Sequence, residues 1–178
     1  LKTKADDQCK WRVTLEPLKV GGEPLTLLVQ GKNQLESKDI LVGEVWLCSG
    51  QSNMEWPLAM ATNADLEISA ANHPNIRLVR VKGPGSQTPV EDFQGEWAAC
   101  TPETAKGFSA VGYFFGRELQ DQLGVPIGFT NNSWGGSACE AWVRRDRLEA
   151  DPNYAPLLKR WDEQVAALEK ETDEKKRA

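Results

Sequence analysis

The pattern of apolar and polar positions changes near residue 40. Over residues 11–15 and again over 25–29, apolar side chains alternate with polar ones, and PLKVGGEP lies between the two stretches. The alternation and the turn residues predict an antiparallel hairpin. From Ile40 onward the apolar runs ILV and VWLC are nearly continuous, which predicts strands covered on both faces. A second architecture therefore begins at about residue 41.

Capping signals mark the helices that follow. In TNADLEISAAN, Thr62 and Asp65 have the spacing of a capping box, and Pro74 is placed to stop the helix. The segment SAVGYFFGRELQDQLG predicts a longer helix, because Ser109 can cap its first turn and Gly124 can close its last. The chain therefore contains at least two helices between its apolar runs.

Strands are predicted between and after these helices. IRLVRV, EWAAC and VPIGFTNN have strand composition, and TPE at residues 101–103 begins another helix. A strand–helix–strand order with short connections is typical of a parallel sheet wrapped by helices, so the fold class is α/β. Apolar residues recur at helical spacing over 155–176 on a Lys/Glu background, which predicts a long amphipathic helix.

Composition and charge exclude several classes of protein. The 178 residues are 40% apolar and 26% charged, as in an ordinary globular protein. The formal net charge of -5 provides no basic field for phosphates, so nucleic acid is not an expected partner. No stretch approaches the roughly 20 apolar residues that a membrane span needs. The start, LKTKADDQCKW, lacks the apolar core of a secretory signal.

Cysteine and tryptophan usage narrows the chemistry further. The four cysteines show no CxxC spacing, which argues against a zinc site or redox pair, and no metal or cofactor is expected. Cys48, within VWLC, is predicted to be a buried small apolar side chain. The seven tryptophans are expected to lie mostly in the core, although aromatic faces are also the surfaces on which sugar rings stack.

The first candidate site is GQSNM, directly after the apolar run VWLC. Ligand crevices of open α/β sheets form where such strands end. Ser52 is the candidate nucleophile and its own N–H a candidate oxyanion donor, while Gly50 permits the turn and the amides of Gln51 and Asn53 can fix the loop. A serine needs a base and oxyanion donors before it reacts. The alternative is ordinary turn chemistry at a strand end.

The second candidate site is SWGGS, which also follows a predicted buried strand. Gly135 and Gly136 can direct backbone N–H groups at an anion, with the helical stretch ACEAW behind them. Here too the alternative is a simple turn. Taken alone, neither motif specifies catalysis.

Together the segments resemble a known family. GEVWLCSGQSNMEWPL, PNIRLVRV, FSAVGYFFGREL and VPIGFTNNSWGGSACEAW are similar to bacterial sialate O-acetylesterases of the SGNH hydrolase superfamily. The resemblance runs from about Trp11 to about Trp142, and GQSNM is its most specific part. It implies that Ser52 is the catalytic serine, and that Gly135 and Gly136 supply oxyanion N–H groups.

The resemblance also implies an architecture, an activity and a location. Residues 1–40 would be the C-terminal part of a β-rich, β-sandwich-like domain. Residues 41–178 would be the N-terminal part of an SGNH-type, flavodoxin-like esterase domain, with a helical insertion at about 150–178. The activity would be removal of O-acetyl groups from sialic acids through an acetyl-enzyme, in the periplasm or outside the cell. The partner would be an O-acetylated sugar, and the oligomeric state is left open.

One part of the family pattern has no counterpart. Such esterases carry a D-x-x-H-like motif near the end of the domain and a Q-G-E-S-N-like segment before it, and neither occurs here. The single histidine, His73 in ANHPNI, is predicted to be a solvated turn residue. We expect the Asp and His to lie beyond residue 178, and this chain alone to be inactive or very slow. The alternatives are an acetylxylan or other polysaccharide esterase and a non-catalytic carbohydrate-binding relative.

Remaining polar features have simpler interpretations. Asn131-Asn132-Ser133 fits a glycosylation sequon, but it abuts a predicted buried strand, so we interpret it as strand-end hydrogen bonding. Three carboxylates near the motifs are predicted to be structural partners or substrate contacts: Glu44, Glu55 and Glu140.

Overall fold

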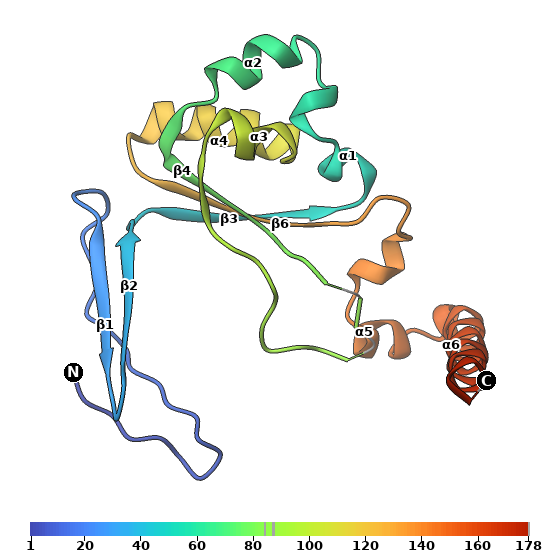
Figure 1. Cartoon of the computed structure of the whole chain (residues 1–178). Coiled ribbons are helices and arrows are strands. Elements are labelled where there is room, and N and C mark those ends of the chain that lie inside the picture. The colour runs from blue at the N-terminus through green and yellow to red at the C-terminus, as the bar shows by residue number, and fades with distance from the viewer. Residues whose placement is uncertain (84, 87, 178) are drawn as a thin grey trace. The chain divides into compact units, whose positions relative to one another are not determined.

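The computed structural model describes residues 1–83, 85–86 and 88–177 (Figure 1). The chain divides into two compact units, residues 1–135 and residues 136–178. The first unit contains a two-stranded hairpin, a four-stranded sheet and its helices. The second is helical. The predicted boundary near residue 40, between domains of a longer protein, stays a prediction.

The four-stranded sheet confirms the predicted α/β class. Its spatial order is β3 (Glu44–Gly50), β6 (Ile127–Ser133), β4 (His73–Arg80) and β5 (Ala98–Cys100). Strands β3 and β4 both pair with β6 in parallel, while β5 pairs with β4 antiparallel. The apolar runs VWLC, IRLVRV and VPIGF therefore lie side by side, as predicted.

Helices of the first unit cover one face of this sheet (Figure 1). They are α2 (Ala64–Ala70), α3 (Pro102–Lys106) and α4 (Ala110–Leu123). Helix α4 packs very closely on β6, because a Cβ at Gly116 would collide with the Phe129 ring. A Cβ at Gly112 would lie 2.9 Å from the Cys48 Sγ. The two glycines thus let the helix approach the strands, and Cys48 is buried as predicted.

The opposite face of the sheet is largely exposed, so the prediction that both faces of these strands are covered is wrong for β3. Val45 is 70% exposed and Leu47 is 65% exposed. On this face a Cβ built on Gly128 would lie 3.3 Å from the ring of Trp97, which is itself half exposed. Among the described residues of the first unit, the helices pack on the other side, so no helix of this unit covers this apolar surface.

The hairpin forms from different residues than predicted. Strand β1 (Leu25–Gln30) pairs antiparallel with β2 (Gln34–Ile40), and GKN at residues 31–33 is the turn. The alternating stretch at residues 11–15 forms no strand in the described chain. The following polar segment, QLESKD, takes its place as the partner of β1, because a short connection closes a hairpin more readily than a long one.

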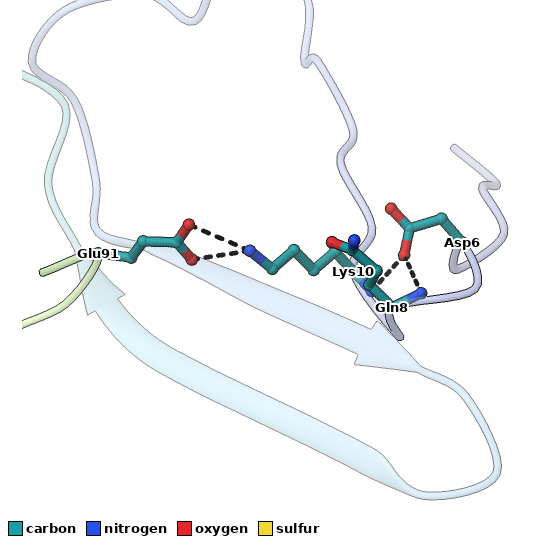
Figure 2. A network of polar contacts seen from close by, with 4 residues as sticks. All are labelled: Asp6, Gln8, Lys10 and Glu91. Atoms are coloured by element: carbon teal, nitrogen blue, oxygen red, sulfur yellow. Dashed lines mark hydrogen bonds and ion pairs between the residues drawn. The ribbon is translucent and has the colours of Figure 1, made fainter.

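The segment before β1 is fixed by polar contacts (Figure 2). The Asp6 carboxylate accepts the backbone N–H groups of Gln8 and Lys10, each at 2.9 Å. The Lys10 ammonium then donates to both carboxylate oxygens of Glu91, at 2.9 and 3.1 Å. This exposed ion pair joins two loops that are 81 residues apart, and exposure limits its contribution to stability to about 1 kcal/mol or less.

Of the five predicted helix ends, three are confirmed and the start of α2 is wrong, while α2 ends at Ala70, before the predicted stop at Pro74. Ser109 caps α4 by accepting the Gly112 N–H, and Gly124 closes it with a φ of 63°. Thr101 caps α3. The Thr62/Asp65 capping box does not form, because α2 begins one residue later, with Asn63 in the left-handed region and no side-chain cap.

The second unit is a set of short helices and one long helix. They are η2 (Cys139–Trp142), α5 (Arg145–Glu149), η3 (Pro152–Tyr154) and α6 (Ala155–Arg177). Arg145 joins α5 to α6 by donating to Asp162 at 3.1 Å, and it also pairs with Glu149 within α5. The predicted long amphipathic helix is therefore confirmed. Among the helices described, none combines the length and apolar character needed to cross a membrane.

Candidate functional site

The turn that carries Ser52 lies at the carboxyl end of β3. Gly50, the last residue of the strand, has a φ of 139°, a conformation that side chains rarely adopt. The chain then enters the short helix α1 (Ser52–Glu55), which the Gln51 carbonyl begins by accepting the N–H groups of Met54 and Glu55. The predicted role of Gly50 in shaping the turn thus has a structural basis.

The Ser52 side chain is exposed and loosely held. Its hydroxyl donates to the Gln51 amide oxygen at 3.4 Å, a long hydrogen bond. Asn53 is also exposed, and its side chain makes no hydrogen bond with another described residue. No basic side chain accepts the Ser52 proton within the described chain. Ser52 therefore has the exposure of a nucleophile without its activation.

The glycine loop lies directly against Ser52. Register pairs Gly50 with Ser133, and the Trp134 N–H continues the ladder by donating to the Gly50 carbonyl at 2.9 Å. A Cβ built on Gly135 would be 3.6 Å from the Ser52 Oγ. The two predicted motifs, 83 positions apart in the sequence, therefore meet at one edge of the sheet because β3 and β6 run parallel.

The Gly135 N–H already has an acceptor. It donates to the Glu55 Oε2 at 2.5 Å, and the other oxygen of this carboxylate accepts from the Arg80 guanidinium at 2.8 Å. For Gly135 to serve an oxyanion, this bond would have to be exchanged for a new one. Gly136 follows with a φ of 78° and belongs to the second unit, so its role as an oxyanion donor stays a prediction.

His73 does not lie at this site, and it is not the solvated turn residue that was predicted. It begins β4, with Nε2 buried and unpaired among the described residues and its ring centroid 6.0 Å from that of Tyr113. Ile76 and Glu44 both stand opposite Ile127 in the sheet, and His73 precedes Ile76 by three residues, so His73 lies beyond the start of β3. At least the length of β3, about 20 Å, separates it from Ser52.

The sequon also lies near the site and is confirmed as strand-end hydrogen bonding. Asn131 is 2% exposed, and its side-chain oxygen accepts from the Ser133 hydroxyl at 2.6 Å. A buried asparagine offers no attachment point for a glycan. This bond instead supports the end of β6 just before the glycine loop.

Burial raises the pKa of the two thiols in the sheet, so neither is activated as a nucleophile. Desolvation raises the pKa of Cys48 above its ordinary value of 9.0 and raises the pKa of Cys100 to about 11. A nucleophilic cysteine needs the opposite shift. Within the described chain no group of three His, Cys, Asp or Glu side chains lies close enough to share a metal ion.

Sequence reasoning missed the Glu55–Arg80 pair. Glu55 was predicted only as a general structural partner or substrate contact, and Arg80 was not singled out. The available signal was positional: Arg80 ends a strand predicted to be parallel to the one before Ser52, and such ends share one edge of a sheet. Glu44 begins β3 at the other edge, and Glu140 lies in the second unit.

Comparisons with known proteins agree with this geometry. A family model described as carbohydrate esterase, sialic acid-specific acetylesterase matches residues 42–172. The chain is 37% identical over 154 residues to sialate O-acetylesterases of Pongo abelii and Homo sapiens, a match covering 79% of this chain. It spans only 29% of the length of those relatives. The crystal structure of a carbohydrate acetylesterase from Xanthomonas citri superposes with a TM-score of 0.79 at 45% identity, covering 84% of this chain and 35% of that one.

Proposed function

Because the chain belongs to the sialic acid-specific acetylesterase family, we propose that it carries the nucleophile of a serine esterase that removes O-acetyl groups from sialic acids. The observation that supports this most directly is the contact between the two motifs. An exposed Ser52 lies at the carboxyl edge of a parallel sheet, with Gly135 packed against its hydroxyl. This edge is where open α/β sheets place ligands.

The reaction would proceed through an acetyl-enzyme. The Ser52 Oγ attacks the acetyl carbonyl and gives up its proton to a base, and the carbonyl oxygen becomes an oxyanion. Collapse breaks the bond to the sugar oxygen, which takes up the proton and leaves as a hydroxyl. Water then attacks the acetyl-serine, releasing acetate and restoring the serine.

The groups near Ser52 supply part of this chemistry. The first N–H groups of a helix have no partner within it, so the Ser52 N–H at the start of α1 can point at the oxyanion. The base is a different matter, because the single histidine of the sequence begins β4 at the far edge. The Asp and His of the family pattern would have to come from sequence outside residues 1–178.

Two exposed tryptophans adjoin the site and suit a sugar substrate. Trp56 directly follows α1 and is 45% exposed, and Trp134 directly precedes Gly135 and is 58% exposed. Aromatic faces provide large apolar contact areas, and polar groups around them fix orientation. The identity to a carbohydrate acetylesterase, 45%, exceeds that to the sialate O-acetylesterases, so an acetylated polysaccharide such as acetylxylan is the second candidate substrate.

The decisive experiment compares Ser52→Ala with His73→Ala in the protein as it occurs naturally. Acetate release from O-acetylated sialic acid and from acetylxylan would be followed by a coupled assay. We expect Ser52→Ala to lower kcat by at least about 10³-fold, because removing the nucleophile leaves only positioning and oxyanion stabilisation. His73→Ala should keep wild-type kcat. Activity that survives Ser52→Ala would remove this serine from the mechanism.

Two further comparisons complete the proposal. The substrate that gives the higher kcat/KM identifies the sugar class, and binding of either sugar without acetate release would favour the non-catalytic alternative. A periplasmic or secreted location is part of the same proposal, taken from the family resemblance. Fractionation of the producing cells, with activity assayed in each fraction, would test it.

A further inference from the structure

The Glu55 carboxylate joins the ends of three strands. Glu55 lies on α1, which follows β3, and its Oε2 accepts the N–H of Gly135 in the loop after β6 at 2.5 Å. Its Oε1 accepts from Arg80, the last residue of β4, at 2.8 Å. A single side chain thus holds together the loops of three neighbouring parallel strands.

Because Glu55 binds both Arg80 and Gly135, its contacts should stabilise the site more than an ordinary surface ion pair would. Exposed Arg–carboxylate pairs contribute little, with a median of about 0–1 kcal/mol. Here a backbone N–H also donates to the ionised oxygen, and such charge-assisted bonds are shorter and roughly twice as strong as neutral ones. The Glu55 side chain is only 35% exposed, and the arginine occupies the oxygen that the glycine leaves free.

The glycine loop has no free space between the carboxylate and the nucleophile. A Cβ on Gly135 would lie 2.7 Å from the Glu55 Oε2 and 3.6 Å from the Ser52 Oγ. Ser52 and Glu55 are three positions apart on α1, and residues at that spacing share one face of a helix. The same helical turn therefore presents the nucleophile and holds the loop opposite it.

The position of Arg80 beside Glu55 is explained by charge balance. A bare carboxylate beside Ser52 would repel the oxyanion that forms during attack, and the guanidinium of Arg80 offsets that charge. The oxygen facing Gly135 then acts mainly as a fixed acceptor. Removing either partner would disturb the site: loss of Glu55 frees the loop, and loss of Arg80 leaves an uncompensated negative charge.

We propose that Glu55, charge-balanced by Arg80, is a positioning residue that fixes the Gly135 loop at its working distance from Ser52. The proposal rests on the function proposed above, since the loop matters only if Ser52 is the nucleophile. It assigns Glu55 no contact with the substrate. Its consequence is that Glu55 substitutions lower kcat and leave KM nearly unchanged, because a small displacement of a reacting group costs up to about 10²-fold in rate.

The variants Glu55→Ala and Glu55→Gln separate the bond to Gly135 from the charge. Glutamine keeps an oxygen that can accept the Gly135 N–H but loses the ion pair with Arg80, whereas alanine loses both. We expect kcat to fall about 10- to 100-fold in Glu55→Ala, with partial recovery in Glu55→Gln. The matched control is Glu67→Gln, which breaks the comparable Glu67–Arg117 pair between α2 and α4 and should leave kcat unchanged.

A second measurement does not depend on turnover. In protein labelled with ¹⁵N-glycine, the Gly135 amide should resonate far downfield and exchange slowly with solvent, as expected for a short bond to a carboxylate. Glu55→Ala should move this signal upfield and speed its exchange about tenfold or more. Glu67→Gln should leave it in place. Thermal unfolding of each variant would check that the fold is retained.

The outcomes distinguish the two proposals. An unchanged Gly135 amide in Glu55→Ala overturns the positioning role, and so does an altered amide with kcat equal to that of Glu67→Gln. Should activity survive Ser52→Ala, the proposed function fails instead, and the amide experiment still reports separately on the bond between Glu55 and Gly135. A kcat that falls together with the amide change, while Ser52 remains essential, supports both.

Discussion

The two ends of the four-stranded sheet carry similar side chains, but only one end holds the candidate active site. At the carboxyl edge, an exposed serine faces a glycine loop, and an arginine–carboxylate pair lies beside it. At the amino edge lie the single histidine, a second arginine–carboxylate pair between Arg77 and Asp39, and a cavity of about 320 Å³. The difference is strand direction, because the loops that follow β3, β4 and β6 all gather at the carboxyl edge.

This contrast shows why a hollow alone is a poor guide to chemistry. The cavity at the amino edge is lined by residues such as Trp97 and Gly128 and has an ion pair at its rim. It contains neither the serine nor the glycine pair. Ligand sites of open α/β sheets follow the carboxyl ends of strands, so the substitutions below should change activity at one edge and only stability at the other.

Among the substitutions that test this comparison, Gly135→Ala at the carboxyl edge is expected to have the largest effect. The new methyl group would lie 2.7 Å from the Glu55 Oε2, so the loop or the carboxylate must move. We expect kcat to fall about 10²-fold, with a modest loss of stability. The matched control is Gly107→Ala, where a Cβ meets nothing within 4 Å and the φ of -95° is ordinary. Equal kcat values for the two variants would contradict the contact.

An intermediate effect is expected on the stability of the protein at alkaline pH, and its source is Cys100 at the amino edge. Desolvation raises the pKa of this fully buried thiol from 9.0 to about 11, although a bond from the His73 backbone opposes the shift. Above pH 9 the unfolded thiol loses its proton while the folded one keeps it, so stability falls as pH rises from 9.0 toward about 11. The loss should be about 2 kcal/mol.

Urea unfolding below pH 9 and near pH 11 would measure this loss. Cys100→Ala should unfold more easily at neutral pH, because it leaves a small cavity, but its stability should decline less over the alkaline range. Its activity near neutral pH should match that of the wild type. A pH dependence identical to that of the wild type would show that another group controls alkaline unfolding.

The smallest effect is expected from Asp39→Asn. The hydrogen bond from Arg77 lowers the pKa of Asp39 below its ordinary value of 3.8. The ion pair therefore adds stability above that pH, and the contribution is lost as pH falls through the lower, folded-state pKa. Asparagine tolerates the φ of 59° at this position, so the backbone should be unchanged.

Acid unfolding followed by circular dichroism would test this exposed pair. Asp39→Asn should shift the acid midpoint slightly upward and leave kcat unaltered. Asp121→Asn, on the exposed surface of α4, controls for the loss of one negative charge. A change in kcat would show that the amino edge contributes to the reaction, contrary to the comparison above.

Much of the sheet could be predicted from local pattern. The apolar runs that became β3, β4 and β6, and the caps at Ser109 and Gly124, follow from residue types that act within a few positions of themselves. The pairing of Ser52 with Gly135 was indicated by the family resemblance, and it agrees with the rule that parallel strands end at one edge. Those parts of the fold and site depend on short-range signals and one topological rule.

The errors arose where the outcome depends on a distant partner. Residues 11–15 alternate as a strand should, yet the hairpin formed elsewhere because QLESKD lies closer to β1 in the sequence. His73 follows the predicted end of a helix, but it pairs with Cys100 and is therefore part of β4. The Glu55–Arg80 pair spans 25 positions, and no local pattern distinguishes its members from other exposed charges.

Strand β3 is one of the two outer strands of the four-stranded sheet. Within the described chain, the main-chain groups along its outer side pair with no other strand, and its exposed Val45 and Leu47 add an apolar surface beside them. Such an unpaired strand is a template on which another extended chain can assemble. Residues 1–178 handled by themselves should therefore grow into larger particles as protein concentration increases, and a lysine at position 45 or 47 should slow that growth.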